Sequence, residues 1–270
     1  MKRIRQVLFG LGAAVVLSGC GEGGEGAPGA DAAELEADNA LVPNALVPNA
    51  LAASALMAIQ DSGQAGALSR MHLKYTVGCA LDSTQSFSFS WTDSLGLSHN
   101  ETYVGMLGLA TGWASGPLGV SAQEWISACL AARTNYYGTP VIISSRGSCG
   151  ALNTVNTSEA AAYANEEGAF WGNIYTSTPA LYSCHVSADD TNSRRQLRDC
   201  AAGHLNPNYT VSSCGMIQIV GACDRFCLSI SSPGLPHLSC WSDPNNKIST
   251  GTLAPVTIYL PAVGWGPERD

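Results

Sequence analysis

Ser121-Ala-Gln-Glu-Trp-Ile-Ser-Ala-Cys-Leu130 is the stretch that most clearly decides the fold class. Ser121 followed three residues later by Glu124 matches a capping box, so a helix is predicted to begin there. The apolar residues of the stretch share one helical stripe: Ala122, Trp125, Ile126, Cys129 and Leu130. Gly138 predicts the end of this helix, with Pro140 just beyond it. The apolar run Val141-Ile-Ile143 that follows predicts a buried strand.

Upstream of this stretch, the sequence predicts another helix and a strand. Asp61-Ser-Gly-Gln64 fits a capping box, and apolar-stripe residues follow at helical spacing: Leu68, Met71, His72, Tyr75 and Cys79. We therefore expect a helix from about 62 to 78, with His72 as a packed, hydrogen-bonded core histidine. Phe87, Phe89 and Trp91 alternate with serines, which is typical of a half-buried strand.

Downstream, the pattern changes from helix to short strands and loops. A helix is expected from about Ser158 to Glu167, capped by Asn156 or Ser158 and ended by Gly168. Residues 215–220 and 256–260 are predicted strands. Six cysteines lie between 184 and 240 among turn-forming residues, so disulfides are expected to hold these loops. The predicted fold class is α+β, with two or three helices, short antiparallel strands and a disulfide-stapled, loop-rich C-terminal part.

Residues 1–19 are typical of an export signal. Lys2, Arg3 and Arg5 precede an uncharged, mostly apolar stretch that is too short for a transmembrane helix. The signal ends at Leu17-Ser18-Gly19-Cys20, which resembles the lipobox of bacterial lipoproteins. That resemblance implies cleavage before Cys20 and acyl chains, such as palmitate, on the mature N-terminal cysteine. An ordinary secretory signal that happens to end in cysteine is the alternative.

Residues 20–60 are predicted to be a stem between the lipid and the folded region. Residues 21–38 are rich in Gly, Ala and acids and lack aromatic residues, which is typical of a flexible tether. The repeats Asn39-Ala-Leu-Val-Pro43 and Asn44-Ala-Leu-Val-Pro48 favour an extended spacer, with a docking strip as the alternative. Residues 61–270 are then expected to form a single disulfide-rich globular domain.

The charge distribution argues against nucleic acid as a partner. The formal net charge is −8, and seven acidic residues lie in 21–65, where no Lys or Arg occurs. There is no basic patch for nucleic acid, and the acidic stem disfavours electrostatic docking to anionic lipid. Association with the membrane is therefore expected to come from the acyl chains on Cys20.

The ten cysteines predict disulfides, because exported proteins fold in oxidising compartments. With Cys20 assigned to lipid, nine remain, so one thiol is expected to be left over. Apart from Cys149, the candidates for pairing are Cys79, Cys129, Cys184, Cys200, Cys214, Cys223, Cys227 and Cys240. We expect Cys79 to pair with Cys129, because both lie on the apolar stripe of a predicted helix.

Two groups of residues offer metal ligands in the sequence. Cys214, Cys223, Cys227, His237 and Cys240 could hold zinc, but their spacing matches no familiar zinc module and the compartment favours disulfides. Asp189, Asp190 and Asn192 offer calcium-like oxygen ligands without the rest of an EF-hand loop, so a polar loop is the better interpretation. We therefore expect no metal and no cofactor.

Two further sets of residues are candidates for catalysis. Arg146-Gly-Ser-Cys149-Gly150 is similar to the nucleophile loop of chymotrypsin-like cysteine proteases, although a disulfide or an inert loop cysteine is the favoured interpretation. Glu159 and Glu166 are seven residues apart and would share a helical face, like a carboxylate pair for glycoside cleavage. A solvated helix face explains them as well, so no catalytic residue is assigned.

Several strings resemble uncharacterised lipoproteins of myxobacteria: the lipobox with its Asn-Ala-Leu-Val-Pro repeats, Tyr75-Thr-Val-Gly-Cys-Ala-Leu81, Glu124-Trp-Ile-Ser-Ala-Cys-Leu130 and Glu167-Gly-Ala-Phe-Trp-Gly172. The resemblance extends over the whole chain. It implies an envelope lipoprotein with a disulfide-bonded domain, and it carries no activity, cofactor or catalytic residue.

The expected function is display of a binding domain by a lipid-anchored envelope protein. Gly21 behind Cys20 predicts the outer membrane, by resemblance to lipoproteins of Gram-negative bacteria. The domain would bind a glycan, a polypeptide or another envelope protein, and Trp113, Trp171 and Trp241 are expected to be exposed for this purpose. The alternative is an extracytoplasmic hydrolase that uses Cys149 or the Glu159–Glu166 pair, and a toxin or cargo lipoprotein is a third possibility.

Overall fold

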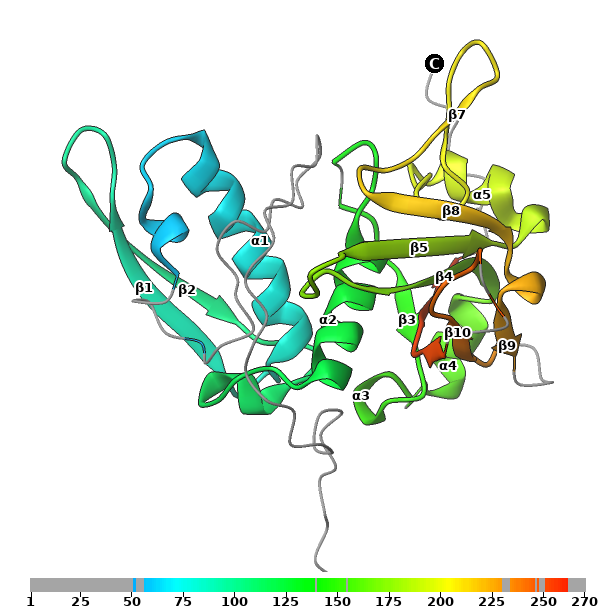
Figure 1. Cartoon of the computed structure of the whole chain (residues 1–270), viewed down its shortest axis with the longest axis horizontal. Helices are drawn as coiled ribbons and strands as arrows, with labels where there is room; N and C mark the ends of the chain where they lie inside the picture. The colour runs from blue at the N-terminus through cyan, green and yellow to red at the C-terminus, as the bar shows by residue number, and fades with distance from the viewer. Residues whose placement is uncertain are drawn as a thin grey trace, which may run out of the picture.

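Two long helices form the centre of the fold in a computed structural model of the chain (Figure 1). The structure describes residues 51, 56–138, 140–153, 155–229, 234–245, 247 and 251–261. Helix α1 spans Gln64–Ala80 and α2 spans Val120–Arg133, and the two are joined by the Cys79–Cys129 disulfide. Both predicted helices and their predicted bond are thus present. The signal, the lipid site Cys20 and the repeats of the stem lie outside the described residues.

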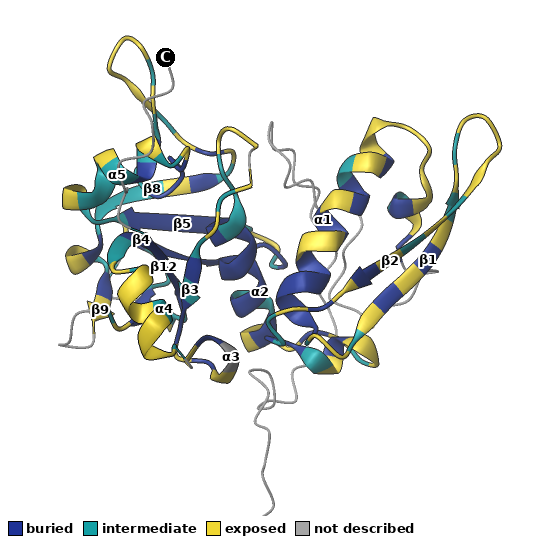
Figure 2. Ribbon diagram, turned by 180° about the vertical axis from the view of Figure 1, so that it is seen from behind, coloured by how far each residue is buried: buried dark blue, intermediate teal, exposed yellow. Residues whose placement is uncertain are grey.

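A β-hairpin packs beside α1. Its strands are β1 (Ser86–Thr92) and β2 (Ser98–Val104), which pair antiparallel. Phe87 and Phe89 are buried, whereas the serines between and beside them are exposed. The alternation predicted for this strand is confirmed. Figure 2 shows the hairpin and α1 at one end of the molecule and the larger sheet at the other.

A five-stranded sheet forms the other half of the described fold. Its strands lie in the order β3 (Ser144–Arg146), β12 (Val256–Leu260), β4 (Asn165–Asn173), β5 (Ala180–His185) and β8 (Ile217–Ala222). Neighbouring strands are antiparallel except β5 and β8, which are parallel. The strand expected at 256–260 is confirmed, and the strand expected at 215–220 begins two residues later.

Both faces of this sheet are covered, so most of β4 is buried. Side chains alternate between the faces of a strand. Phe170 therefore contributes to the core shared with Ile126 of α2, while Trp171 contributes to a second core cluster on the other face. A three-stranded sheet supplies part of that second cluster, in the order β11 (Thr252–Leu253), β10 (His237–Trp241) and β9 (Cys227–Ser229).

The remaining elements are short. They are α3 (Gly150–Asn153), α4 (Thr157–Ala162), α5 (Asp190–Arg195), the hairpin of β6 (His204–Leu205) and β7 (Val211–Ser212), and 3-10 turns at Met57–Gln60, Thr111–Ala114, Ser187–Asp189 and Cys223–Arg225. The described residues thus form an α+β fold. Within them, no helix has both the length and the apolar character needed to cross a membrane.

The expected boundaries of α2 and of the strand after it are wrong. The helix begins after Gly119 without a side-chain cap, so Ser121 does not cap it. It ends at Arg133, because Thr134 is already extended, and Gly138 takes a positive φ of 64° in the turn beyond. Ile142 is 76% exposed, and strand pairing begins only at Ser144. Apolar side chains alone do not determine which residues pair with β12, so the strand was expected at 141–143 instead of at Ser144–Arg146.

The helix expected over residues 158–167 is also wrong beyond Ala162. Asn156, one of the two expected caps, accepts a hydrogen bond from the Glu159 backbone N–H at 2.8 Å. The helix then ends, and Glu166 and Glu167 lie on strand β4. Pairing with strands on both sides buries Phe170 and Trp171, and this burial outweighs the local preference for helix.

Four disulfides join described cysteines that are 13 to 50 residues apart in the sequence. They are Cys79–Cys129, Cys184–Cys223, Cys200–Cys214 and Cys227–Cys240. Such a set indicates an extracytoplasmic protein. Cys149 is disulfide-bonded as well, and no cysteine of the described region is free. No leftover thiol is therefore present among these residues in this structure, whereas acylation of Cys20, which lies outside them, would leave an odd number of cysteines and so one unpaired thiol.

Candidate functional site

Cys149 does not offer a nucleophile in this structure. It lies between β3 and α3, it is buried, and its sulfur is disulfide-bonded. Nucleophilic attack by cysteine requires a thiolate. The resemblance of residues 146–150 to a protease loop therefore does not extend to a reactive sulfur.

Glu159 and Glu166 do not form the expected pair on one helical face. Glu159 lies on α4, where its Oε1 accepts a hydrogen bond from the Ser144 hydroxyl at 2.8 Å. Glu166 lies on β4, where its Oε1 is 2.8 Å from Nε2 of His237. The two carboxylates belong to different environments, and each leads to a different candidate site.

Glu159 lines an open pocket of about 270 Å³ near the edge of the main sheet. The apolar part of its wall consists of Met106, Leu107, Ile143, Leu152 and Val155. Arg133, at the end of α2, and Ser145, on β3, complete the lining. Apolar side chains together with charged and hydroxyl groups give this concave surface both kinds of contact that a small molecule can use.

Arg133 is the strongest electrostatic feature of this pocket. Burial lowers the pKa of its guanidinium, because the cation has lost part of its hydration. Its Nη2 donates to the Met106 sulfur at 3.0 Å, and thioether sulfur is a weak acceptor. Of the described carboxylates, none lies within 4.0 Å of it. The cation is therefore free to pair with an anionic ligand.

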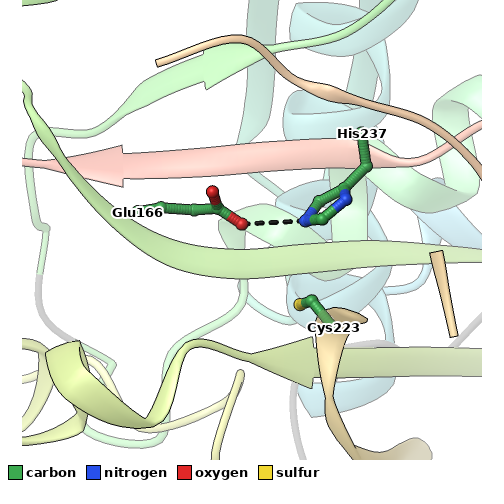
Figure 3. A group of neighbouring side chains, drawn as sticks. All are labelled: Glu166, Cys223 and His237. Atoms are coloured by element: carbon green, nitrogen blue, oxygen red, sulfur yellow. Dashed lines mark hydrogen bonds and ion pairs between the residues drawn. The ribbon is translucent and has the colours of Figure 1, made fainter. Parts of the chain in front are cut away.

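A second candidate site surrounds His237, on the opposite side of the sheet from α2. Nε2 of His237 faces Glu166 at 2.8 Å, and Nδ1 lies 2.8 Å from the hydroxyl of Ser229 (Figure 3 draws the Glu166 contact). The histidine is buried, and Ser229 is exposed. A hydroxyl, an imidazole and a carboxylate in series are the elements of an activated nucleophile.

Tyr259 and Arg146 support the carboxylate of this second site. The Tyr259 hydroxyl lies 3.3 Å from Oε2 of Glu166 and donates to the Leu235 carbonyl at 2.9 Å. Burial and the nearby Glu166 raise the pKa of Tyr259, so this hydroxyl keeps its proton. The guanidinium of the buried Arg146 stacks over the Tyr259 ring at 3.8 Å. Glu166 is thereby held in place beside the histidine.

The same residues bring three potential metal ligands together without forming a metal site. Donor atoms of Glu166, Cys223 and His237 lie within 4.8 Å of one another (Figure 3). Cys223, however, is bonded to Cys184, and a disulfide sulfur is not the thiolate that binds metals. The nitrogen of His237 that faces Glu166 is also already used. The donor set therefore does not fit a metal in this state.

The zinc constellation considered from the sequence comes together only in part. Cys223, Cys227 and Cys240 lie in one buried cluster, but Cys184 takes the place of Cys214, which pairs with Cys200. All of these cysteines are in disulfides, as the compartment led us to expect. His237 lies beside this cluster and not among its sulfur ligands, because its ring contacts Ser229 and Glu166.

The residues considered for calcium and for ligand stacking have structural roles. Asp189 and Asp190 begin α5 and not an open loop, and the Asn192 amide donates to Asp189 at 3.1 Å. Burial raises the pKa of Asp189 to about 6, whereas a calcium site stabilises the ionised form.

Trp113 and Trp171, which were expected to be exposed, are fully buried. Of the three tryptophans, only Trp241 is partly exposed.

The sequence alone pointed to Glu159 and Glu166 but missed Arg133 and Ser229. Arg133 is the last residue of α2, which is a common position for a basic residue and carries no signal of a pocket. Ser229 is 63 residues from Glu166 in the chain, so no local motif connects them. Only strand pairing brings Ser229 opposite His237.

Comparisons with known proteins return no family model, no curated protein and no solved structure that matches this chain. The residues and their geometry are therefore the basis for any inference about function.

Proposed function

We propose that this protein is an exported lipoprotein, anchored in the outer membrane through Cys20, whose folded region binds a small zwitterion with an apolar side chain. A free apolar amino acid is the simplest such ligand. The observation that carries the proposal is Arg133, a partly buried cation in a pocket wall with no carboxylate partner among the described residues. Binding, and not turnover, is the activity proposed for this pocket.

The ligand class follows from the three kinds of group that line the pocket. Arg133 would pair with a carboxylate, since a guanidinium matches carboxylate oxygens in two parallel hydrogen bonds. Glu159 would accept from an ammonium group, while Ser144 holds its other side in place. The five apolar side chains would cover an aliphatic side chain. These groups together favour a ligand with both charges over a neutral glycan, which has neither.

Calorimetric titration of the purified soluble domain tests this proposal with three related probes. L-leucine carries both charges, N-acetyl-L-leucine lacks the ammonium and L-leucinamide lacks the carboxylate. We expect L-leucine to bind at least roughly tenfold more tightly than either blocked form, which corresponds to about 1.4 kcal/mol for each lost ion pair.

Substitution of the cation identifies the pocket. Arg133→Gln should weaken L-leucine binding by roughly tenfold or more, because the ligand carboxylate would be desolvated without a partner. Arg225→Gln removes an exposed arginine outside the pocket and should leave binding unchanged. Equal binding of the three probes, no binding of any of them, or an unchanged Arg133→Gln affinity would each reject the ligand class.

The anchor requires a separate experiment. Replacing Cys20 with Ser removes the acceptor sulfur, so the protein should lose incorporation of labelled palmitate and leave the membrane fraction. A stem variant such as Glu36→Gln should keep both properties. Normal lipid labelling of the Cys20→Ser protein would exclude lipidation at this residue.

A further inference from the structure

We propose that Ser229 is a nucleophilic serine, activated by His237 and Glu166, that takes an acyl group from a carboxylic ester. This activity is independent of the pocket around Arg133, which involves none of these residues. Three segments meet to form the arrangement: Ser229 ends β9, His237 begins β10 and Glu166 lies on β4.

Strand pairing sets the hydroxyl against the imidazole. Ser229 and His237 are direct partners in the antiparallel register of β9 and β10, so their side chains are neighbours. The Ser229 hydroxyl lies 2.8 Å from Nδ1 of His237. The backbone N–H of His237 donates to the Thr257 hydroxyl at 3.0 Å, which ties β10 to β12 of the main sheet. The base is therefore held on rigid elements.

The carboxylate determines which ring nitrogen carries the proton. A Glu166 carboxylate can only accept, so Nε2 of His237 must donate across their 2.8 Å contact. In the neutral imidazole, Nδ1 is then the acceptor, and the Ser229 hydroxyl is its donor. The proton of Ser229 thus points at the base that would remove it. The two ring nitrogens have the reverse of their roles in the serine protease triad, with the same chemical consequence.

Burial separates the base from water and leaves the nucleophile accessible. Only 4% of His237 is exposed, whereas Ser229 is exposed on the surface. Glu166 is partly buried, and its Oε2 faces the Tyr259 hydroxyl. A purely structural Ser229–His237 hydrogen bond would not require Ser229 to be exposed, nor Glu166 to be held by Tyr259 on the other side of the imidazole.

The proposed reaction has two balanced steps. In the first, the Ser229 oxygen bonds to the ester carbonyl carbon while His237 takes its proton, and the departing alkoxide then receives that proton and leaves as an alcohol. In the second, water attacks the acyl-serine and gives its proton to His237, which returns it to the Ser229 oxygen as the carboxylic acid leaves. The net reaction is ester plus water to alcohol plus acid.

Labelling with diisopropyl fluorophosphate tests the nucleophile directly. The Ser229 oxygen would displace fluoride from phosphorus and retain the diisopropylphosphoryl group, which mass spectrometry of the digested protein locates. We expect label at Ser229 and none in Ser229→Ala. Ser90→Ala is the matched control, because Ser90 is an exposed serine hydrogen-bonded to Asn100 on the distant hairpin and should not change labelling.

Glu166 is a positioning residue, and the pH dependence of labelling tests its role. The charged and titratable groups around His237 are Glu166 on β4, Tyr259 on β12, Arg146 on β3, and Asp189, which is near enough to feel the charge of Glu166. The labelling rate should rise with pH as the imidazole loses its proton. In Glu166→Gln the plateau rate should fall about tenfold or more, whereas Glu166→Asp, which keeps a carboxylate acceptor for Nε2 of His237, should retain more of that rate.

Ester turnover provides the second measurement. The wild-type protein should release nitrophenolate from p-nitrophenyl acetate. Ser229→Ala changes an exposed side chain, so it should keep the wild-type circular dichroism spectrum and abolish the release. Label spread over several serines, turnover that persists in Ser229→Ala, or a Glu166→Gln rate equal to wild type would overturn the proposal and leave a purely structural Ser229–His237–Glu166 contact.

Discussion

His72 is a buried histidine without a hydrogen-bond partner among the described residues. The sequence placed it on the apolar face of α1, and its burial is confirmed. The expected hydrogen bonding is wrong, since neither ring nitrogen has a partner within the described region. Helical spacing predicts which face a side chain occupies, but a partner must come from another segment. Loss of hydration lowers the pKa of His72 to about 4.

This histidine predicts that the protein loses stability in mild acid. The ordinary value of 6.5 applies to the unfolded chain, so below pH 6.5 the unfolded state takes up a proton that the folded state rejects until about pH 4. The His72 contribution is therefore complete above pH 6.5 and is lost as the pH falls to 4, by about 3 kcal/mol. Urea unfolding across this range measures the loss.

Replacing the ring isolates its contribution. His72→Leu removes both unpaired nitrogens, so the variant should be at least as stable as wild type and should lose most of the pH dependence between 6.5 and 4. His99→Gln changes a partly exposed histidine on the hairpin and should keep that dependence. If His72→Leu unfolds with the wild-type pH profile, His72 is not the group responsible.

Helix α1 begins with a capping interaction displaced from its expected position. Asp61 was expected to open a capping box with Gln64, whereas the structure places the cap at Gly63. Oδ1 of Asp61 accepts from the backbone N–H groups of Gly63 at 2.7 Å and Gly66 at 3.2 Å. The expectation that the Asp61 side chain accepts from backbone N–H groups at the start of this helix was right. Its partners are not those of a capping box with Gln64, because the chain turns between Asp61 and the first helical residue.

Removing this carboxylate should destabilise the start of α1. We expect Asp61→Ala to lower the free energy of unfolding by about 1 kcal/mol, the typical contribution of a helix N-terminal cap. Asp61→Asn keeps an oxygen acceptor and should lose less than half of that amount. Equal stability of Asp61→Ala and wild type in urea unfolding would show that the two backbone N–H groups are satisfied by water.

Strand β4 shows how far tertiary contacts can override local preference. The sequence around Glu166 and Glu167 continues a helical pattern, yet both residues are extended. Glu167 is buried beside Arg198, whose Nη2 lies 2.9 Å from its Oε2, and Arg198 also donates to the Ala132 carbonyl at the end of α2. Through the Glu167 ion pair and the Ala132 hydrogen bond, Arg198 connects three segments that are distant in the sequence. A short local stretch of sequence therefore could not predict these contacts.

The disulfides connect the helices to each other and fasten the C-terminal loops. Cys79–Cys129 closes a separation of 50 residues, whereas Cys200–Cys214 closes one of 14. Removing each pair should lower the free energy of unfolding by about 4 and about 3 kcal/mol respectively, because the longer loop restricts the unfolded chain more.

Paired cysteine-to-alanine variants measure this difference. Cys79→Ala with Cys129→Ala should have a lower urea midpoint than Cys200→Ala with Cys214→Ala, and both should be less stable than wild type. The second pair serves as the control for the general loss of a disulfide. The opposite order would show that strain in the folded state, and not loop length, determines what each bond contributes.

Local patterns by themselves determined the α+β class, both long helices, the β1 strand and the pairing of Cys79 with Cys129. These features depend on periodicity and on which face a side chain occupies, and both are properties of consecutive residues. Tertiary structure alone decided the burial of Trp113 and Trp171, the extended conformation of Glu166 and the partners of the other cysteines. It also decided both candidate sites. Arg133 and Glu159 line one pocket, and His237 contacts both Ser229 and Glu166, only because separate segments of the chain pack or pair.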